Sequence, residues 1–304
     1  MTILLDRGTR VCVVGVTGGR ARADTELNLA YGTTIVCGVA PGRGGQNIAG
    51  VPVYDTCGAA AAEHAIDAVI AYLPPRAYRA AMADVLAVRP GWVHVVTEGI
   101  PLHDNVAVLT EARRAGVRLI GPNTSGIISP GRAKVGFMAH ASWLMSPGRL
   151  VVLSRSGGFT HDLAYLLSRS GFGISTAVGI GGDAVAGSSF ADFVALAEDD
   201  PETDAVVLYG EAGPAIEREV ADGVRSGRFR KPVVALVAGD FLEDHAHGAV
   251  FGHAGAFLEG PETTATAKRE ALRAGGVHVA TAIDDIPHLL AAAGVPATGT
   301  ASRP

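Results

Sequence analysis

Two side chains in the second half of the sequence are suited to nucleophilic chemistry. His253 lies among small residues in Val250–Ala256, so other molecules can approach its imidazole from several sides. Glu211 follows a predicted strand, Ala205–Tyr209, and His253 comes after the next predicted strand. A carboxylate that accepts a proton from histidine Nδ1–H fixes the tautomer and leaves the Nε2 lone pair facing outward. The pair therefore predicts a histidine nucleophile whose positive charge after attack is stabilised by Glu211.

A glycine-rich turn after the first predicted strand indicates anion binding. Gly15–Arg20 follows that strand directly, and Arg22 adds a second positive charge. The carboxyl ends of parallel strands and the amino ends of the following helices present unpaired N–H groups to ligands. The turn therefore predicts a phosphate-bearing, nucleotide-type ligand, although the same glycines would also serve tight packing of strand against helix. No acidic residue stands at Val39 or Ala40, where NAD binding would favour one.

Two further turns of this kind occur in the second half. Ser154-Arg155-Ser156-Gly157-Gly158 precedes a predicted helix, and its N–H groups and hydroxyls could form an anion nest. Serines that cap a helix explain the same pattern equally well. Gly179–Asp183 follows another strand and leads to Ser188, a second candidate cap.

Metal and hydrolase sites are not favoured by the pattern. Asp244, His245, His247 and His253 could be read as metal ligands, but a His-x-His pair in a polar loop is more typical of a surface. We therefore predict no metal site. Ser156 lacks the glycine that precedes the serine in a Gly-x-Ser-x-Gly elbow, which argues against hydrolase chemistry.

These residues must be positioned by an α/β fold, because short β-branched runs alternate with alanine-rich stretches of helical length. In the first half this pattern is Rossmann-like. The predicted strands there are Val11–Val14, Thr34–Val39, Ala68–Tyr72, Trp92–Val96 and Val117–Ile120. The predicted helices there are Thr25–Tyr31, Cys57–His64, Arg76–Val88 and Asn105–Ala115.

The second half predicts a flavodoxin-like parallel-sheet domain. Its predicted strands are Leu150–Leu153, Ile174–Val178, Ala205–Tyr209, Val233–Val237 and Val277–Ala280. Its predicted helices are Phe159–Ser168, Ser188–Glu198, Ala215–Ser226, Thr264–Ala274 and Asp285–Ala293. Because the periodicity lapses between Pro122 and Arg149 and ends near Val295, we expect domains at 1–122 and 149–294, a linker at 123–148 and a flexible tail at 295–304.

Composition excludes several classes of partner. The 304 residues are 48% hydrophobic and 18% charged, and the formal net charge is −5. Without a Lys/Arg-rich run, neither a nucleic-acid surface nor a basic membrane patch is predicted. Apolar runs fall short of the ~20 residues that span a bilayer. Three cysteines without metal-ligand spacing, and the lack of an export leader before Leu4, favour a reducing cytoplasm.

Six motifs together resemble the alpha subunit of succinyl-CoA synthetase, or succinate–CoA ligase, over about residues 3 to 293. The motifs are Thr97-Glu98-Gly99-Ile100-Pro101, Gly121-Pro122-Asn123, Ser154-Arg155-Ser156-Gly157, Gly179-Ile180-Gly181-Gly182-Asp183, Gly210-Glu211 and Gly252-His253-Ala254-Gly255-Ala256. The resemblance implies a CoA-binding domain followed by a ligase domain.

The resemblance further implies a three-step ligase reaction. ATP or GTP, bound with Mg²⁺ to a separate ATP-grasp beta subunit in a heterodimer or heterotetramer, would phosphorylate His253. The phosphate would pass to a small carboxylic acid, and coenzyme A would attack the acyl phosphate. Glu211 would orient His253, while Ser154, Arg155, Ser156, Gly157 and Gly158 would hold the phosphorylated ring.

The implied CoA contacts include several departures from the family pattern. They comprise Thr17, Gly18, Gly19, Arg20, Arg43, Tyr72, Thr97, Glu98 and Asn123. Gly19 and Arg20 replace the usual serine and glutamine, Arg43 replaces a lysine, and Thr124 replaces a cysteine. We therefore expect a paralogue that acts on a different acid. A non-catalytic CoA-binding or regulatory paralogue is the alternative, and an NAD(P) oxidoreductase is disfavoured.

Overall fold

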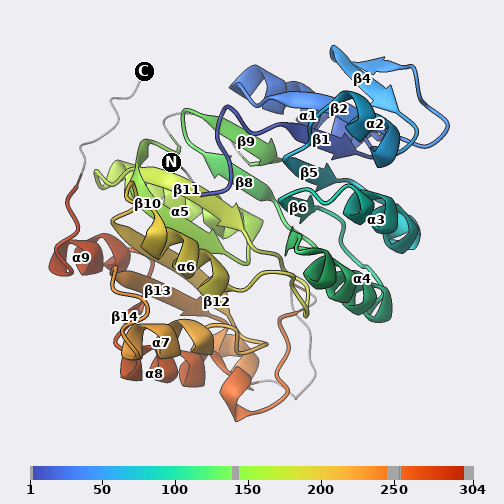
Figure 1. Cartoon of the computed structure of the whole chain (residues 1–304). Coiled ribbons are helices and arrows are strands. Elements are labelled where there is room, and N and C mark those ends of the chain that lie inside the picture. Colours follow the sequence, from blue (N-terminus) through green and yellow to red (C-terminus); the bar gives the residue numbers. More distant parts are fainter. Residues whose placement is uncertain (1–2, 139–143, 245–252, 254, 298–304) are drawn as a thin grey trace.

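The chain folds into two α/β domains, each built around a mainly parallel sheet (Figure 1). The computed structural model describes residues 3–138, 144–244, 253 and 255–297. Elements of the first sheet, blue to teal in Figure 1, lie beside those of the second, green to red. The predicted architecture, a Rossmann-like domain followed by a flavodoxin-like parallel-sheet domain, is confirmed.

The first sheet has the strand order β3-β4-β2-β1-β5-β6-β7. Its strands are β1 (Val11–Val14), β2 (Ile35–Val39), β3 (Asn47–Ile48), β4 (Val51–Tyr54), β5 (Ala68–Ala71), β6 (Trp92–Val95) and β7 (Arg118–Ile120). Its helices are α1 (Gly19–Tyr31), α2 (Cys57–Glu63), η1 (Pro75–Ala77), α3 (Tyr78–Ala87) and α4 (Leu102–Ala115). Strand β3 is antiparallel to β4 and the other pairs are parallel, which gives the Rossmann order on both sides of β1.

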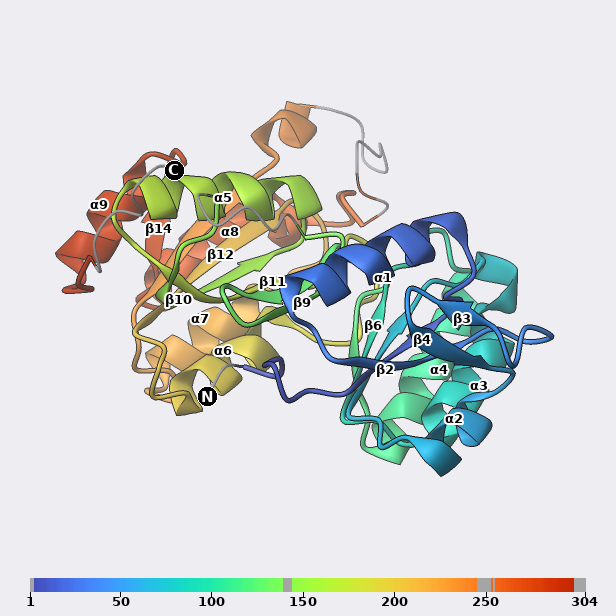
Figure 2. The same ribbon diagram turned by 90° about the horizontal axis from the view of Figure 1, so that it is seen from above.

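The second sheet has the order β14-β13-β12-β10-β11-β8-β9. Its strands are β8 (Gly126–Ser129), β9 (Ala133–Gly136), β10 (Pro147–Ser154), β11 (Ile174–Gly179), β12 (Ala205–Glu211), β13 (Val233–Ala238) and β14 (His278–Ala280). Its helical elements are α5 (Gly157–Arg169), α6 (Phe190–Asp199), α7 (Arg218–Arg225), η2 (Asp240–Asp244), η3 (Pro261–Thr263), α8 (Ala265–Ala274) and α9 (Asp285–Ala292). The five strands from β10 to β14 are parallel in the flavodoxin order, and Figure 2 shows α5 and α6 on opposite faces.

Alternating side chains of the strands divide the core into layers. On β1, Cys12 and Val14 pack toward α2, α3 and α4, whereas Val11 and Val13 belong to a cluster that continues into the second sheet. That continuous cluster includes Ile127 of β8, so the two domains share apolar packing. At about 25 cal/mol per Å² of apolar surface buried, this shared packing opposes relative movement of the two sheets.

The structure adds strands that the sequence pattern did not predict. The segment 123–148, expected as a linker, contains β8 and β9, and β8 pairs antiparallel with β11. The expectation of a plain linker is therefore wrong for residues 126–136, because they form the edge of the second sheet. Val295, placed in the expected tail, is buried in the core of the second domain, and residues 298–304 lie outside the described residues.

Both sheets have a topological switch point, where neighbouring strands lead to helices on opposite faces. In the first sheet the switch lies between β1 and β5, and in the second between β10 and β12. Ligands of open α/β sheets bind at the carboxyl ends of strands at such points. The glycine-rich turn after β1 and the residues Ser154 and Glu211, which end β10 and β12, lie at these two positions.

No helix within the described ranges has both the length and the apolar character of a membrane span.

Candidate active site

His253 and Glu211 form the centre of the site. The Nδ1 atom of His253 lies 2.8 Å from Oε1 of Glu211 and 3.0 Å from Oε2. The Glu211 side chain is 13% exposed and that of His253 is 29% exposed, so the pair is partly shielded from water. His253 Nε2 makes no hydrogen bond to any residue that the structure describes. The contact leaves Nε2 as the free ring nitrogen.

The hydrogen bond that Nδ1–H of His253 donates to Glu211 raises the pKa of His253 above its ordinary value of 6.5. Burial and the positive charge of Arg155 oppose this shift, and the charge of Glu98 adds to it. Raising the pKa means that Glu211 stabilises positive charge on the ring. A histidine that becomes positively charged on attack gains from the same contact.

Arg155 is buried behind this pair. Its Nε atom lies 3.2 Å from Glu211 Oε1, and the Arg155 side chain is only 2% exposed. One terminal nitrogen donates to the backbone carbonyl of Asp183 at 2.9 Å. Arg155 therefore ties the carboxylate of Glu211 to the glycine-rich loop that follows β11.

Two glycines allow this close packing. A Cβ on Gly182 would lie 2.9 Å from both Cγ and Cδ2 of His253, and a Cβ on Gly255 would lie 2.4 Å from a terminal nitrogen of Arg155. The amide of Gly255 also donates to the carbonyl of Gly182 at 3.1 Å. The glycine-rich loop and the histidine loop therefore lie directly against each other.

Asn123 connects this site with the first domain. Its amide donates to the carbonyl of Thr97 at 2.9 Å, and its own carbonyl accepts from the amide of Gly182 at 3.0 Å. The buried Nδ2 of Asn123 and the buried Oδ1 of Asp183 make no hydrogen bond of standard geometry within the described part of the chain. Burial raises the pKa of Asp183, and the neighbouring amide of Asn123 opposes this shift. The two polar side chains therefore lie next to each other, beside the backbone that joins Thr97 to Gly182.

The Ser154–Gly158 loop leads into α5 beside this site. Ser154 pairs in register with Tyr209 of β12, two residues before Glu211, so both strand ends share one edge of the sheet. Ser156 caps α5, because its hydroxyl accepts from the amide of Phe159 at 3.4 Å. Gly157 and Gly158 begin the helix, where N–H groups have no acceptor within the helix.

A cavity of about 970 Å³ opens at the switch point of the first sheet. Its lining includes most of the residues expected to contact CoA, namely Thr17, Gly18, Gly19, Arg20, Arg43, Tyr72 and Thr97, whereas Glu98 and Asn123 are outside the lining. Gly15 has a φ of 80°, and a Cβ there would lie 2.1 Å from the carbonyl oxygen of Tyr72. Only glycine fits where the cavity floor turns.

Arg20 links the cavity with the second domain. Its Nε donates to Asp24 at 2.8 Å, and its guanidinium lies 4.5 Å from the ring centre of Phe137. Phe137 in turn lies 4.0 Å from the position of a Cβ on Gly157, at the start of α5. The mouth of the cavity and the amino end of α5 are therefore separated by one aromatic ring.

Several site residues were not anticipated as such from the sequence. Asp183 and Gly182 were recognised only as part of a glycine-rich turn, and nothing in the pattern pointed to Phe137. No group of three or more His, Cys, Asp or Glu side chains within the described ranges is placed to hold a metal ion, while His245 and His247 lie outside those ranges.

Comparison with known proteins agrees with this architecture. Residues 6–99 match the CoA binding domain family, and residues 147–293 match the succinyl-CoA ligase like flavodoxin domain family. The chain is 42% identical over 286 residues to the ADP-forming succinate–CoA ligase subunit alpha 1 of Archaeoglobus fulgidus, which covers 94% of this chain and 96% of that protein. It is 37% identical over 298 residues to the ADP-forming sulfoacetate-CoA ligase subunit SqwL of an Acholeplasma species, covering 97% of this chain and 99% of that protein.

A solved structure shares the whole arrangement. ATP citrate lyase from Methanothrix soehngenii, in complex with citrate and coenzyme A, matches with a TM-score of 0.89 at 26% identity. The match covers 99% of this chain and 53% of that chain, so the protein spans about half the length of the lyase chain.

A CoA-binding Rossmann-like domain joined to a flavodoxin-like ligase domain defines the class of CoA-ligase subunits. Within that class, the chain belongs to the succinate–CoA ligase alpha-subunit family, whose relatives include ADP-forming ligases of succinate and of sulfoacetate.

Proposed function

We propose that this chain is the alpha subunit of a carboxylate–CoA ligase that forms a nucleoside diphosphate and carries a phosphoryl group on His253. The observation that carries the proposal is the 2.8 Å contact between His253 Nδ1 and Glu211, while Nε2 has no hydrogen bond to the residues that the structure describes. Relatives that are ADP-forming CoA ligase subunits support it.

The first step would be attack of His253 Nε2 on the γ-phosphorus of ATP or GTP. The new bond joins nitrogen to phosphorus, and the bond from that phosphorus to the β-phosphate oxygen breaks, which releases the nucleoside diphosphate. Glu211 balances the positive charge of the phosphorylated ring. The N–H groups of Gly157 and Gly158, at the positive end of the α5 dipole, would hold the phosphoryl oxygens.

In the second step a carboxylate oxygen of the acid would attack the phosphorus and free His253. The resulting acyl phosphate would then be attacked at its carbonyl carbon by the thiol of coenzyme A. A carbon–sulfur bond forms, phosphate leaves, and the thiol proton passes to phosphate or solvent.

Coenzyme A would occupy the cavity of the first domain. Thr17–Arg20 surround the amino end of α1, where a helix dipole favours phosphate, and Arg43 supplies a fixed positive charge. Tyr72 and Thr97 line the cavity, and Thr97 lies beside Asn123, because the amide of Asn123 donates to the carbonyl of Thr97. The thiol end would therefore point toward Asn123 and the histidine site.

The partner would be an ATP-grasp beta subunit, in a heterodimer or heterotetramer, that binds ATP or GTP with Mg²⁺. The metal ion neutralises charge on the nucleotide phosphates when bound there. In this chain, His253 would receive the phosphoryl group, Glu211 would contact the ring and Arg155 would hold Glu211, so no separate nucleotide site is needed. The acid would be a small carboxylic acid, while Gly19 and Arg20, which line the cavity, would alter the contacts with coenzyme A.

The proposal is tested by co-purifying the chain with its candidate beta subunit and adding γ-labelled ATP or GTP. We expect a label on wild type that is labile in acid and stable in base, and none on His253→Ala. A complex that binds CoA and nucleotide but takes up no label would instead favour the non-catalytic CoA-binding or regulatory paralogue.

A further inference from the structure

A buried ion pair lies directly behind the candidate active site. Lys268 of α8 and Glu217, which precedes α7, approach to 2.8 Å between Nζ and Oε2, with side chains 2% and 1% exposed. Charges so far from water are costly unless they are paired and hydrogen-bonded. The reaction scheme above uses neither residue.

The ammonium group of Lys268 makes two further contacts, one to the last residue of β12 and one to the loop that follows it. Nζ donates to the carbonyl of Glu211 at 2.7 Å and to the carbonyl of Pro214 at 2.8 Å. Glu217 neutralises the charge of the ammonium at 2.8 Å, while neither of its oxygens has a hydrogen bond of standard geometry within the described part of the chain. Lys268 therefore holds the backbone of the very residue whose side chain contacts His253.

The connection after β12 is also confined on its other sides. A Cβ on Gly210 would lie 2.4 Å from Oε1 of Glu217, so the carboxylate packs against the strand one residue before Glu211. A Cβ on Gly213 would lie 2.2 Å from the carbonyl oxygen of Gly255 in the histidine loop. The backbone around Glu211 is thus enclosed between the ion pair and the histidine loop.

We propose that Lys268 and Glu217 are positioning residues, which hold the end of β12 so that the Glu211 carboxylate meets Nδ1 of His253. The role in phosphoryl transfer rests on the proposed function, whereas the placement of Glu211 does not. Lys268 supplies the hydrogen bonds to the two carbonyls, and Glu217 supplies the negative charge that lets the ammonium remain there.

The pKa of His253 is a direct measure of whether the Glu211 carboxylate lies at Nδ1, because the charges that face the ring set this pKa. Glu211 raises the pKa of the ring through its hydrogen bond, Arg155 lowers it, and the negative charge of Glu98 adds a smaller increase. Asp183 lies near the same ring, and its own pKa is raised by burial. If Glu211 moves away from Nδ1, the pKa of His253 falls toward its ordinary value, whereas a change in stability alone leaves it in place.

The decisive variant is the double substitution Lys268→Met with Glu217→Gln. It removes both buried charges together and conserves side-chain volume, so that no unpaired charge remains in the core. The pKa of His253 is measured by NMR on the full chain labelled in its histidines, with the His253 signal assigned from His253→Asn. We expect a lower pKa in the double variant, and phosphorylation in the complex slower by roughly 10- to 100-fold, the effect of displacing a catalytic group by about 1 Å.

Glu217→Gln alone separates the contribution of the Lys268 hydrogen bonds from that of the Glu217 charge. It keeps Lys268 and both of its backbone contacts but leaves the ammonium without a counter-charge. Because burial already lowers the pKa of Lys268, this variant favours a neutral amine that can still donate to two carbonyls. The His253 pKa should then remain closer to wild type than in the double variant.

Lys134→Met provides a matched control for loss of a buried lysine. Lys134 lies on β9, at the opposite side of the sheet from β12, and its Nζ donates to the carbonyl of Met138 at 3.0 Å. It should lower stability without changing the pKa of His253.

An unchanged His253 pKa in the folded double variant would overturn the proposal. A lowered pKa with no label even in the wild-type complex would uphold the positioning role and reject phosphoryl transfer.

Discussion

The backbone of Gly182 lies directly against the imidazole of His253. A Cβ at Gly182 would come within 2.9 Å of Cγ and Cδ2 of the ring, closer than such atoms pack in proteins. The two residues belong to loops that follow β11 and β13, and the intervening strands place both loops at one edge of the sheet. The orientation of the ring is therefore set from one side by Gly182 and from Nδ1 by Glu211.

Gly182→Ala should displace the ring and slow phosphorylation of His253 by roughly 10- to 100-fold, because misplacement by about 1 Å has effects of that size. The rate of label uptake in the complex measures this. Gly58→Ala is the control, since a Cβ on Gly58 of α2 would meet nothing closer than 3.9 Å. That control should phosphorylate normally, and a wild-type rate for Gly182→Ala would show that the ring needs no such contact.

Glu211→Gln should preserve the fold but slow phosphorylation by on the order of 100-fold or more. An amide stabilises positive charge less than a carboxylate does, and it can donate to Nδ1 and select the other tautomer. Initial rates of label uptake measure the loss. Phosphorylation at the wild-type rate would remove Glu211 from the mechanism.

The same variant has a defined effect on stability against pH. The folded-state pKa of His253 is raised above 6.5, so the stability gained from Glu211 is fully present below pH 6.5 and is lost as pH rises through the raised value. The difference in Tm between wild type and Glu211→Gln should therefore be greatest below pH 6.5 and shrink at higher pH. A difference that grows with pH would contradict the charge assignment.

Arg155→Met should raise the pKa of His253, whereas loss of the Glu211 carboxylate should lower it. Because the charge of Arg155 lowers the pKa of His253, its loss should move the pH dependence of phosphorylation to higher pH. Removing one partner of a buried ion pair should also cost on the order of 3 kcal/mol of stability. Arg155→Lys keeps the charge and should keep the wild-type pH dependence. A shift to lower pH in Arg155→Met would show that Arg155 acts in another way.

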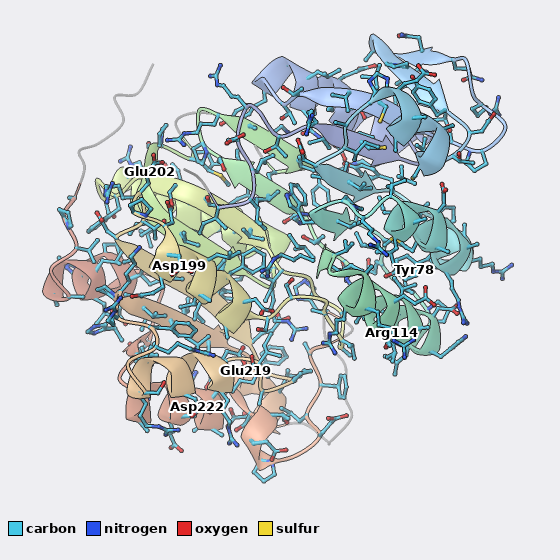
Figure 3. The ribbon with its side chains drawn as sticks, in the orientation of Figure 1. Tyr78, Arg114, Asp199, Glu202, Glu219 and Asp222 are labelled. Atoms are coloured by element: carbon cyan, nitrogen blue, oxygen red, sulfur yellow. The ribbon has the colours of Figure 1, made fainter. Side chains whose placement is uncertain are left out.

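Arg43→Gln should weaken CoA binding by about tenfold, the loss expected for one hydrogen bond to a charged group. Calorimetric titration at two salt concentrations measures both the affinity and its reduced dependence on salt. Arg114→Gln is the control, since Arg114 lies on α4 in Figure 3 and is outside the cavity lining. Equal losses in the two variants would mean that general charge, not a contact at Arg43, attracts CoA.

Much of the fold was predictable because apolar runs recur where the parallel strands lie. The start of α1 was missed, since the sequence pattern placed the helix at Thr25 and the structure begins it at Gly19. Its buried residues Ala21, Asp24, Thr25 and Asn28 are mostly polar, so hydrophobic periodicity carries no signal there. β8 and β9 were missed because they are short and contain glycine and the buried Lys134.

The site was only partly readable from sequence. Glu211 and His253 could be paired because both follow strands that end at one edge of a sheet. Lys268 could not be recognised, because a lysine next to Arg269 in a polar helix is typical of an exposed face. Its burial depends on Glu217 and on the carbonyls at the end of β12, which come together only in the folded chain.

Transfer of label from γ-labelled ATP or GTP to this chain, in complex with its beta subunit, tests the central claim most directly. The account predicts a label that is labile in acid, stable in base and absent from His253→Ala. A label retained by His253→Ala, or no label on a wild-type complex that binds nucleotide and CoA, would contradict the phosphohistidine mechanism.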